Sequence, residues 1–506
     1  MGSFKVSSRI LKKTLTRALS TTPDFQPKPF EAIPGPKGCY QWPVVGTLLL
    51  FKPFSNYTPE TFHKLLDDMF DKYGPIIKLR LGAPHVIVSD PEDFQTVFRN
   101  EGKFPVRTPI SLITALSKRT GLKDSMPNLK GQEWHTLRSP LNRHLLKADS
   151  ALHYLEQQNQ VAEEFAKLLA EQNMNPEDLA ELFFRFAAES IALVTFNRRL
   201  GFFSPDIDDE SKQFLQASRD GIKLIYYSQS GKSIAHTWYR NQTYREYEKV
   251  ALITRRFAWK HLEIAREENR RREKEGTLNT EEPNLLLSLT KESSLSDDDI
   301  SNIMSSLYSA ATDSTAKNLQ VLFYNLAKNP DKQEALRKEI HSVLGANGPL
   351  TAAALSQMSY LKACVKESFR LNYPVVSGPM RILSTDVILS NYTVPAGTTI
   401  MMANSRAVKT HFEETDQFMP ERWLRTSESR KHDVTSHFVA LPFGHGPRNC
   451  IGRRFAEQEI YLAASKVIQS LKIDLDKESW DTSFIYKLFI EPEKPLRFRF
   501  TKINSS

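Results

Sequence analysis

The segment that decides the fold reads FGHGPRNCIG and spans Phe443–Gly452. One cysteine, Cys450, stands in it among glycines and a proline, a composition typical of a rigid loop whose backbone a flat ligand can approach. A helical pattern follows it, from about Gly452 to Leu471. The sulfur is therefore expected near a helix N-terminus and beside Arg448, and both favour a thiolate over a thiol.

Two interpretations of Cys450 follow from the residues alone. A single thiolate presented in this way suits the axial position of a haem iron, and the alternative is a structural cysteine buried in a glycine-rich turn. The other cysteines, Cys39 and Cys364, lie far away in the sequence. This spacing excludes a disulfide framework and a cysteine-rich zinc module, and it indicates a reducing compartment.

Length and composition predict one large, well-packed domain. The chain has 506 residues, of which 40% are hydrophobic and 25% charged, enough apolar material for a sizeable core. The pattern is almost wholly helical from about residue 130 to 370. The longest predicted helix begins at Ser296, with Asp299 in a capping box, and runs to Lys328 before Asn329-Pro330.

Shorter elements surround this helical region. Thr58–Tyr73 has the pattern of an amphipathic helix, and Asp90 is expected to cap another helix that begins at Pro91. Alternating segments at Ile76–Leu81 and His85–Ser89 predict a β-hairpin. Further short strands are expected after Pro374, at Thr385–Leu389 and Thr398–Met402.

The cysteine loop resembles the haem-binding signature of the cytochrome P450 family, Phe-x-x-Gly-x-Arg-x-Cys-x-Gly, and matches every fixed position. The resemblance extends over about residues 30–500. It implies haem b with Cys450 as the axial thiolate ligand of the iron. It also implies the cytochrome P450 fold, mainly α with small β-sheets: a single large helical domain with a β-rich subdomain around a buried haem.

Other motifs resemble the same family in the same order. Glu367-Ser-Phe-Arg370 matches its Glu-x-x-Arg element, and the segment around Arg422 matches the one whose arginine completes that ion-pair network. By resemblance, this network is a structural lock behind the haem. Trp134 and Arg138 match a Trp-x-x-x-Arg helix that binds a haem propionate. The resemblance places Arg381 and Arg448 as further propionate partners.

The oxygen-activating segment departs from the family pattern. The long central helix of the family usually carries Ala/Gly-Gly-x-Asp/Glu-Thr-Thr, and here Ala310–Thr315 reads AATDST. The catalytic residues implied are Asp313 and Ser314, or Thr315, as the proton relay. Ser314 still supplies a hydroxyl and Ala311 adds only a methyl group, so oxygen activation is expected to survive, with more uncoupling. The alternative is that Ser314 has no catalytic role.

Electron supply follows from a closer resemblance to the mitochondrial branch of the family. The sequences after Cys450 and around Lys362 and Lys366 carry that likeness. In that branch the matching lysines receive an acidic ferredoxin of the adrenodoxin type, because a basic patch steers and orients an acidic partner. The alternative is two ordinary solvated lysines.

The N-terminus also predicts a mitochondrial location. Residues 1–23 contain five basic residues and no acid, in an amphipathic pattern typical of a mitochondrial transit peptide. Residues 1–24 are therefore predicted as the transit peptide, 25–42 as a Pro-rich linker and 43–506 as the monooxygenase domain. A basic solvated tail is the alternative. No segment is apolar enough to span a bilayer, so contact with the inner mitochondrial membrane, on the matrix side, is expected to be peripheral.

The function implied is a haem-thiolate monooxygenase that uses O2 and ferredoxin electrons to hydroxylate a hydrophobic small molecule of steroid or sterol type. Some segments resemble invertebrate members. Without the five basic residues of the N-terminus the net charge falls from +9 to +4, which is too mild to indicate a nucleic-acid partner. The alternatives are a haem-thiolate isomerase or dehydratase that needs no redox partner, and a non-catalytic haem carrier. The substrate pocket is expected from five segments: 104–126, 202–230, 306–315, 375–379 and 484–489.

Overall fold

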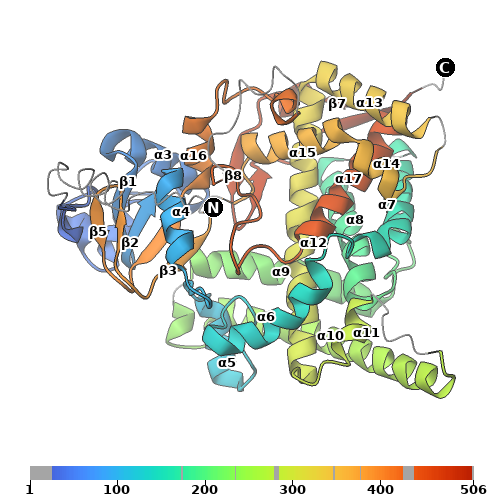
Figure 1. The fold of residues 1–506 in the computed structure, drawn as a ribbon, viewed down its shortest axis with the longest axis horizontal. Coiled ribbons are helices and arrows are strands. Elements are labelled where there is room, and N and C mark those ends of the chain that lie inside the picture. The colour runs from blue at the N-terminus through green and yellow to red at the C-terminus, as the bar shows by residue number, and fades with distance from the viewer. Residues whose placement is uncertain are drawn as a thin grey trace, which may run out of the picture.

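The structure, a computed structural model, describes residues 26–171, 175–233, 235–277, 284–345, 348–375, 378–424 and 438–503. Its elements separate into two regions, with most helices on one side and strands β1, β2, β3 and β5 with α3 and α4 on the other (Figure 1). This arrangement confirms the predicted mainly α fold with a β-rich subdomain. None of the described helices is long and apolar enough to pass through a membrane.

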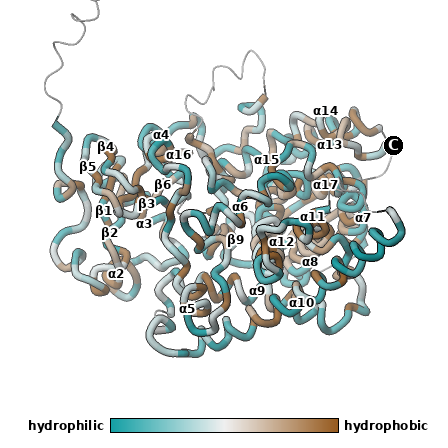
Figure 2. Tube along the Cα trace, turned by 60° about the horizontal axis from the view of Figure 1, so that its bottom comes forward, coloured by the Kyte–Doolittle hydropathy of each residue, from teal (hydrophilic) through white to brown (hydrophobic). Residues whose placement is uncertain are grey.

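Helix α12 (Asp297–Lys328) is the axis of the helical region. It begins at the predicted capping box, in which Ser296 and Asp299 satisfy each other's backbone N–H groups, and it ends at Asn329 before Pro330. Both predicted ends are therefore confirmed. Figure 2 shows much hydrophobic trace where α12 passes α8 (Pro176–Phe196), consistent with the burial of its sides by neighbouring helices.

The other helices cover α12 or support the β-rich region. Two predicted helix ends are confirmed. Asp90 caps the helix that begins at Pro91 and accepts a hydrogen bond from the N–H of Glu92 at 2.8 Å, and α3 ends before Gly74. The remaining helices are α2 (Val45–Leu49), α3 (Phe62–Tyr73), α4 (Pro91–Asn100), α5 (Ser111–Thr120), α6 (Gly131–Leu145), α7 (Leu155–Glu171), α9 (Asp209–Gln229), α10 (Gln242–Lys274), α11 (Leu285–Leu289), α13 (Pro330–Leu344), α14 (Ala352–Gln357), α15 (Ser359–Leu371), α16 (Asn404–His411), α17 (Arg453–Ser470) and α18 (Lys477–Trp480).

The main sheet has the strand order β1-β2-β6-β3. Strands β1 (Ile76–Leu81) and β2 (Ala83–Val88) form the predicted hairpin, with Ile76 opposite Val88. The second strand begins at Ala83 and not at His85, because Gly82 turns the chain alone with a φ of +76°. Strand β6 (Thr399–Met402) pairs in parallel with β2 and antiparallel with β3 (Met380–Ile382).

Three two-stranded sheets complete the fold. They pair β4 (Val387–Leu389) with β5 (Tyr392–Val394), β7 (Leu471–Leu475) with β10 (Phe498–Lys502), and β8 (Phe484–Tyr486) with β9 (Ile490–Pro492). The hairpin β8–β9 lies beside α12, between the helical and β-rich regions (Figure 1). It is the one that bears on the site described below.

The segment before residue 43 is part of the fold where the structure describes it. Lys28 exchanges backbone hydrogen bonds of 2.9 Å with Asn391 and Thr393, and Ile33 is buried in the core of the β-rich region. The stretch is extended at Lys28, where it pairs with the edge of a sheet, and forms 3-10 turns at Phe30–Ala32 and Gly38–Gln41. The stretch predicted as a linker therefore packs as a structural element from residue 26. The predicted transit peptide, residues 1–24, lies outside the described residues.

Candidate active site

The cysteine loop is held by its own backbone and by two glycines. The N–H of Cys450 donates to the carbonyl oxygen of Phe443 at 2.8 Å. Gly444 and Gly446 have φ values of +69° and +76°, which favour glycine, and a side chain at Gly446 would collide with the carboxylate of Glu101. The loop then enters α17, for which Gly452 is the N-cap.

The thiol of Cys450 is accessible at the surface of the loop although protein surrounds it. Burial raises the pKa of the thiol, while the Gly452 amide, Arg138 and Arg453 act in the opposite direction. A thiol with a raised pKa becomes a thiolate when a metal ion coordinates it. The protein surroundings alone therefore do not activate this sulfur as a free nucleophile.

The predicted basic residues converge around this loop. Arg138 on α6 donates to the carbonyl oxygen and the side-chain oxygen of Asn449, each at 2.8 Å. The guanidinium of Arg448 lies over the ring of Trp134, 4.5 Å from its centroid. Arg381 on β3 pairs with Glu101 and donates to the carbonyl oxygen of His445 at 3.2 Å. All five predicted cofactor-binding residues thus lie in one place.

Arg107 joins this cluster and was not predicted. Its charge and those of Arg138 and Arg381 lower the pKa of Arg448, which burial and this repulsion together bring to about 9. Burial first, and then Arg381, lowers the pKa of Arg107 itself to about 10. Arg107 stands in the Pro-flanked segment Pro105–Pro109, where the sequence carries no signal apart from its charge.

The cluster has unbalanced positive charge, which fits a dianionic ligand. Among the described residues, only Glu101 forms an ion pair with one of the four arginines, Arg381. The Nη1 atom of Arg448 is buried and has no hydrogen-bond partner among the residues that the structure describes. Buried guanidinium groups in this state require carboxylates. Haem b carries two carboxylates, so the residues present fit that group.

A second charge network lies behind the loop. The buried carboxylate of Glu367 accepts two hydrogen bonds of 2.8 Å from Arg370 and one of 3.0 Å from Arg422. The Trp423 indole and the Met419 N–H donate to the same carboxylate at 2.9 Å. The predicted three-residue network is confirmed. Phe369 of the same helix packs edge-on to Phe443, with ring centroids 5.5 Å apart, so the network supports the loop directly.

The structure separates the residues predicted as the proton relay. Asp313 is nearly buried and pairs with Lys317 at 2.9 Å. The Ser314 hydroxyl is partly accessible and donates to the carbonyl oxygen of Ala310 at 2.8 Å, within its own helix. Ala310, one turn before Ser314, lines the cavity described below. Ser314 therefore lies on the same helix face as Ala310, one turn beyond the residues of α12 that line the cavity.

Thr315 lies on a different side of α12, toward Glu459 of α17. Thr315 is 1% exposed, and its hydroxyl lowers the pKa of the buried Glu459 carboxyl. Burial raises the pKa of Glu459 to about 8, although Ser190, Thr315 and Gln158 lower it. Glu459 also accepts a hydrogen bond of 3.1 Å from Gln158. Thr315 is therefore a core residue. It can differ from Ser314 in this way because neighbouring helix positions point about 100° apart.

A cavity of about 290 Å³ lies between α12, α9, α10 and the chain around α5. Its apolar wall comes from α5, α9, α10 and the tip of hairpin β8–β9, and its polar stripe comes from α12. The stripe residues are Asn302, Ser305, Ser306 and Ser309, and the apolar wall includes Ile110, Ile113, Leu116, Ile222, Ile225, Val250, Leu488 and Phe489.

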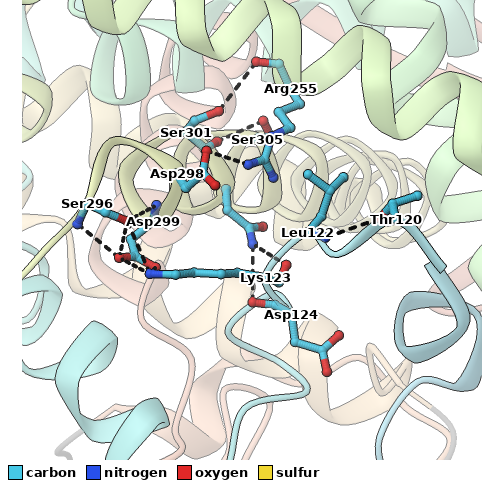
Figure 3. Close-up of polar contacts among 11 residues, drawn as sticks. Thr120, Leu122, Lys123, Asp124, Arg255, Ser296, Asp298, Asp299, Ser301 and Ser305 are labelled. Carbon is cyan, nitrogen blue, oxygen red and sulfur yellow. Dashed lines mark hydrogen bonds and ion pairs between the residues drawn. The ribbon is translucent and has the colours of Figure 1, made fainter. Parts of the chain in front are cut away.

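Ion pairs close the end of the cavity near the start of α12. Figure 3 shows the side chain of Lys123 extended to Ser296 and Asp299, with 2.9 Å between Lys123 Nζ and Asp299 Oδ2. Arg255 pairs with Asp298 at 2.6 Å. The Asn302 side-chain amide donates to the carbonyl oxygen of Lys123 at 3.3 Å. Both basic residues of the cavity wall are thus neutralised by acids of α12.

Four of the five predicted pocket segments contribute to this cavity: 104–126, 202–230, 306–315 and 484–489. Described residues of the segment 375–379 do not line it. The contribution of α10, from Tyr247 to Arg255, was missed. A long sequence rich in charged residues is typical of a solvated surface helix. Only the packing of the fold shows which of its faces is enclosed.

The predicted docking lysines lie on α15. Lys366 is exposed and stands over the Trp423 ring, 5.8 Å from its centroid. Lys362 is half-buried and donates to the carbonyl oxygen of Ser356 at 2.9 Å. Burial, and then the charge of Lys366, lowers the pKa of Lys362. The charge of Lys366 acts on Lys362, so the two lysines form one small basic patch.

Comparison with known proteins agrees with this geometry. The family model described as Cytochrome P450 matches residues 36–500. Cytochrome P450 CYP12A2 of Musca domestica is 29% identical over 90% of this chain and 89% of its own. Two Mus musculus proteins, 1,25-dihydroxyvitamin D(3) 24-hydroxylase, mitochondrial, and Cytochrome P450 11B2, mitochondrial, are each 29% identical over 94% of this chain, covering 90% and 94% of their own. The chain belongs to the cytochrome P450 family and is a monooxygenase of that family.

Proposed function

We propose that the chain binds haem b through Cys450 and uses O2 and two electrons from an acidic ferredoxin to hydroxylate a neutral, steroid-like molecule. The observation that carries this proposal is one accessible cysteine in a rigid loop beside four arginines that have a single carboxylate partner among the described residues. A thiolate-ligated haem supplies oxygen activation, because the sulfur donates electron density that favours cleavage of the O–O bond.

The residues around the loop would hold and orient the cofactor. Arg138, Arg381, Arg448 and Trp134 are proposed as partners of its carboxylates, and Arg107 adds a fourth guanidinium to the same group. Because burial lowers the pKa of Arg138 to about 10 and of Arg448 to about 9, a negative ligand is favoured there. Asp313 is proposed to take up protons from the solvent side, and Ser314 to orient them on the cavity side.

The cavity supports a neutral substrate with few polar groups. Its two basic wall residues, Lys123 and Arg255, are each paired with an acid. An anionic substrate such as a fatty acid would have to break one of these pairs. Uncharged hydrogen-bonding groups of the α12 stripe face an apolar wall, which suits a flat hydrophobic molecule bearing hydroxyl or carbonyl oxygens.

The basic patch of Lys362 and Lys366 is proposed as the ferredoxin docking surface, and the relatives named mitochondrial support that partner class and a mitochondrial location. Changing both lysines to glutamate should weaken ferredoxin-supported turnover several-fold and leave peroxide-supported turnover intact. An equal loss of both would remove the docking assignment.

Peripheral attachment to the inner mitochondrial membrane is supported by two exposed apolar groups. Trp42, Leu48 and Phe54 are exposed near α2, and Trp238 and Tyr239 are exposed before α10. The ion pair of Lys232 with Glu60 joins the chain leading to Trp238 with the chain that follows Phe54. Exposed aromatic and apolar side chains of this kind are typical of segments that lie partly in the headgroup layer of a membrane.

The central test is reduction of the haem-loaded protein under carbon monoxide. The wild type and the control Cys364→Ala, which changes a buried cysteine of α15, should show the red-shifted carbonyl absorption of a haem thiolate. Cys450→Ala should lose it. Retention of that absorption by Cys450→Ala would refute the proposal.

The substitutions at Ala311 and Ser314 favour one other candidate, an isomerase or dehydratase that needs no redox partner. Product formation without NADPH, ferredoxin and ferredoxin reductase would establish this alternative. Strict dependence on all three would exclude it.

A further inference from the structure

A chain of four charged side chains runs from α12 to the hairpin β8–β9. The Lys317 Nζ atom lies 2.9 Å from Asp313 Oδ2 and 2.9 Å from Glu491 Oε2. The second oxygen of Glu491 pairs with Lys487. The exposed fraction of the side chains is 9% for Asp313 and 43% for Lys487. The chain thus connects a nearly buried carboxylate with the protein surface.

The same hairpin touches the cavity. Leu488 and Phe489, at its tip, line the cavity wall. Its strands pack on α12, since Tyr486 and Ile490 form a buried cluster with Val321, one turn after Lys317. Glu491 stands on β9 next to Ile490, two residues from the cavity-lining Phe489.

The electrostatics make Lys317 a shared partner. Burial lowers the pKa of Lys317, but the carboxylates of Asp313 and Glu491 outweigh it and the pKa is raised. Burial raises the pKa of Glu491, but Lys317 and Lys487 outweigh it and that pKa is lowered. One lysine side chain is thus shared between the side chains of Asp313 and Glu491. A stronger pair on one side weakens the pair on the other.

We propose that Lys317 is a positioning residue that couples occupancy of the cavity to proton delivery: the hairpin, through Glu491, sets how firmly Lys317 holds the Asp313 carboxylate. This inference rests on the proposed role of Asp313 in the proton relay. One productive turnover combines substrate, dioxygen, two electrons and two protons into hydroxylated product and water. When proton delivery is mistimed, the same electrons and protons leave with dioxygen as hydrogen peroxide.

The variant Lys317→Met keeps the length and apolar stem of the side chain and removes the ammonium. Asp313 then loses its counter-charge in a nearly buried position, which favours its neutral form and releases its orientation. We expect dioxygen consumption to fall about tenfold, a part of the 10²–10⁴ that a positioned acid or base contributes. Proton transfer then limits the rate, so the ratio of rates in H2O and D2O should rise. Lys317→Arg should restore both values.

The assay uses the haem-loaded enzyme with NADPH, an adrenodoxin-type ferredoxin and its reductase, first alone and then with progesterone as the probe steroid. Lys466→Met is the matched control, because Lys466 is also mostly buried and pairs with Glu163 at 2.7 Å. The control should leave the solvent isotope effect unchanged. A change in the control equal to that in Lys317→Met would overturn the inference.

The link through the hairpin is tested by Glu491→Gln. It should raise the peroxide released per NADPH, and the double variant with Lys317→Met should be no worse than Lys317→Met alone, since both act on one path. Hydrogen exchange of residues 484–492 should increase in both single variants and not in Lys466→Met. A silent Glu491→Gln, or additive effects, would overturn the coupling.

The variant Asp313→Asn distinguishes the proposed proton relay from the proposed positioning role of Lys317. If Asp313→Asn leaves the rate and the isotope effect unchanged, the proposed proton relay is wrong. If Asp313→Asn slows turnover and Lys317→Met does not, the relay stands and the positioning role of Lys317 is overturned. If both slow turnover and Lys317→Arg restores it, the inference is supported.

Discussion

Replacement of Glu367 by glutamine should destabilise the protein more than any surface charge change. The variant keeps the side-chain volume and removes one negative charge. In the structure that charge faces Arg370 and Arg422, which are 2% and 7% exposed, and it accepts hydrogen bonds from both. Without it, two buried guanidinium groups remain with carbonyl partners only, such as those of Thr415 and Gln417 at 2.7 and 2.8 Å.

The magnitude follows from the cost of breaking one buried ion pair, about 3–5 kcal/mol. At roughly 2 °C per kcal/mol for a large domain, the thermal midpoint should fall by about 6–10 °C. The control is Glu163→Gln, whose side chain is 41% exposed and whose pair with Lys466 has a comparable distance of 2.7 Å. A surface pair of this kind is worth about 0–1 kcal/mol.

The assay is thermal unfolding of the haem-loaded proteins at one heating rate, followed by circular dichroism and by the haem absorption. The haem absorption should be lost at or before the helical signal in Glu367→Gln, because the network supports Phe443 through Phe369. A midpoint for Glu367→Gln within 1–2 °C of the control, a difference of at most about 1 kcal/mol, would refute the reasoning.

Three further outcomes are expected. Arg448→Leu should lower the haem bound per protein several-fold, measured by absorbance against protein mass, because it removes the guanidinium whose Nη1 has no partner in the described part of the chain. Full occupancy would contradict this expectation. Ser314→Ala should raise the peroxide released per product, and unchanged coupling would remove Ser314 from the mechanism. Burial raises the pKa of Glu459 to about 8, so the folded state binds an extra proton between about pH 4.5 and 8 and loses stability as the pH rises through that window. Glu459→Gln should therefore flatten the dependence of the thermal midpoint on pH over this range, and an unaltered slope would show that Glu459 does not titrate there.

Much of the architecture was predictable because its signals are local. The ends of α12 follow from a capping box at Ser296 and from Asn329-Pro330, and the start of α4 follows from Asp90 and Pro91. Backbone rules of this kind act within a few residues. The cysteine loop was predictable for the same reason, since its glycines, Arg448 and Cys450 stand within ten residues.

The stretch before residue 43 shows where local signals fail. Its prolines predict an extended chain, whereas the structure has 3-10 turns at Phe30–Ala32 and Gly38–Gln41 and pairs Lys28 with Tyr392 across more than 350 residues of sequence. Pairing of an extended segment depends on which sheet edge lies within reach. That is a property of the assembled fold and not of composition.

The sequence by itself determined the helical class, the haem loop, the Glu367 network and the family, because each depends on a short run of residues with a fixed chemical role. Only the tertiary structure decided that Arg107 joins the basic cluster, that Thr315 lies by Glu459 while Ser314 shares a helix face with Ala310, and that Lys317 links Asp313 to Glu491. These relations join residues that are remote in sequence, or they depend on which side of a buried helix a residue occupies. Packing of whole elements against one another sets both.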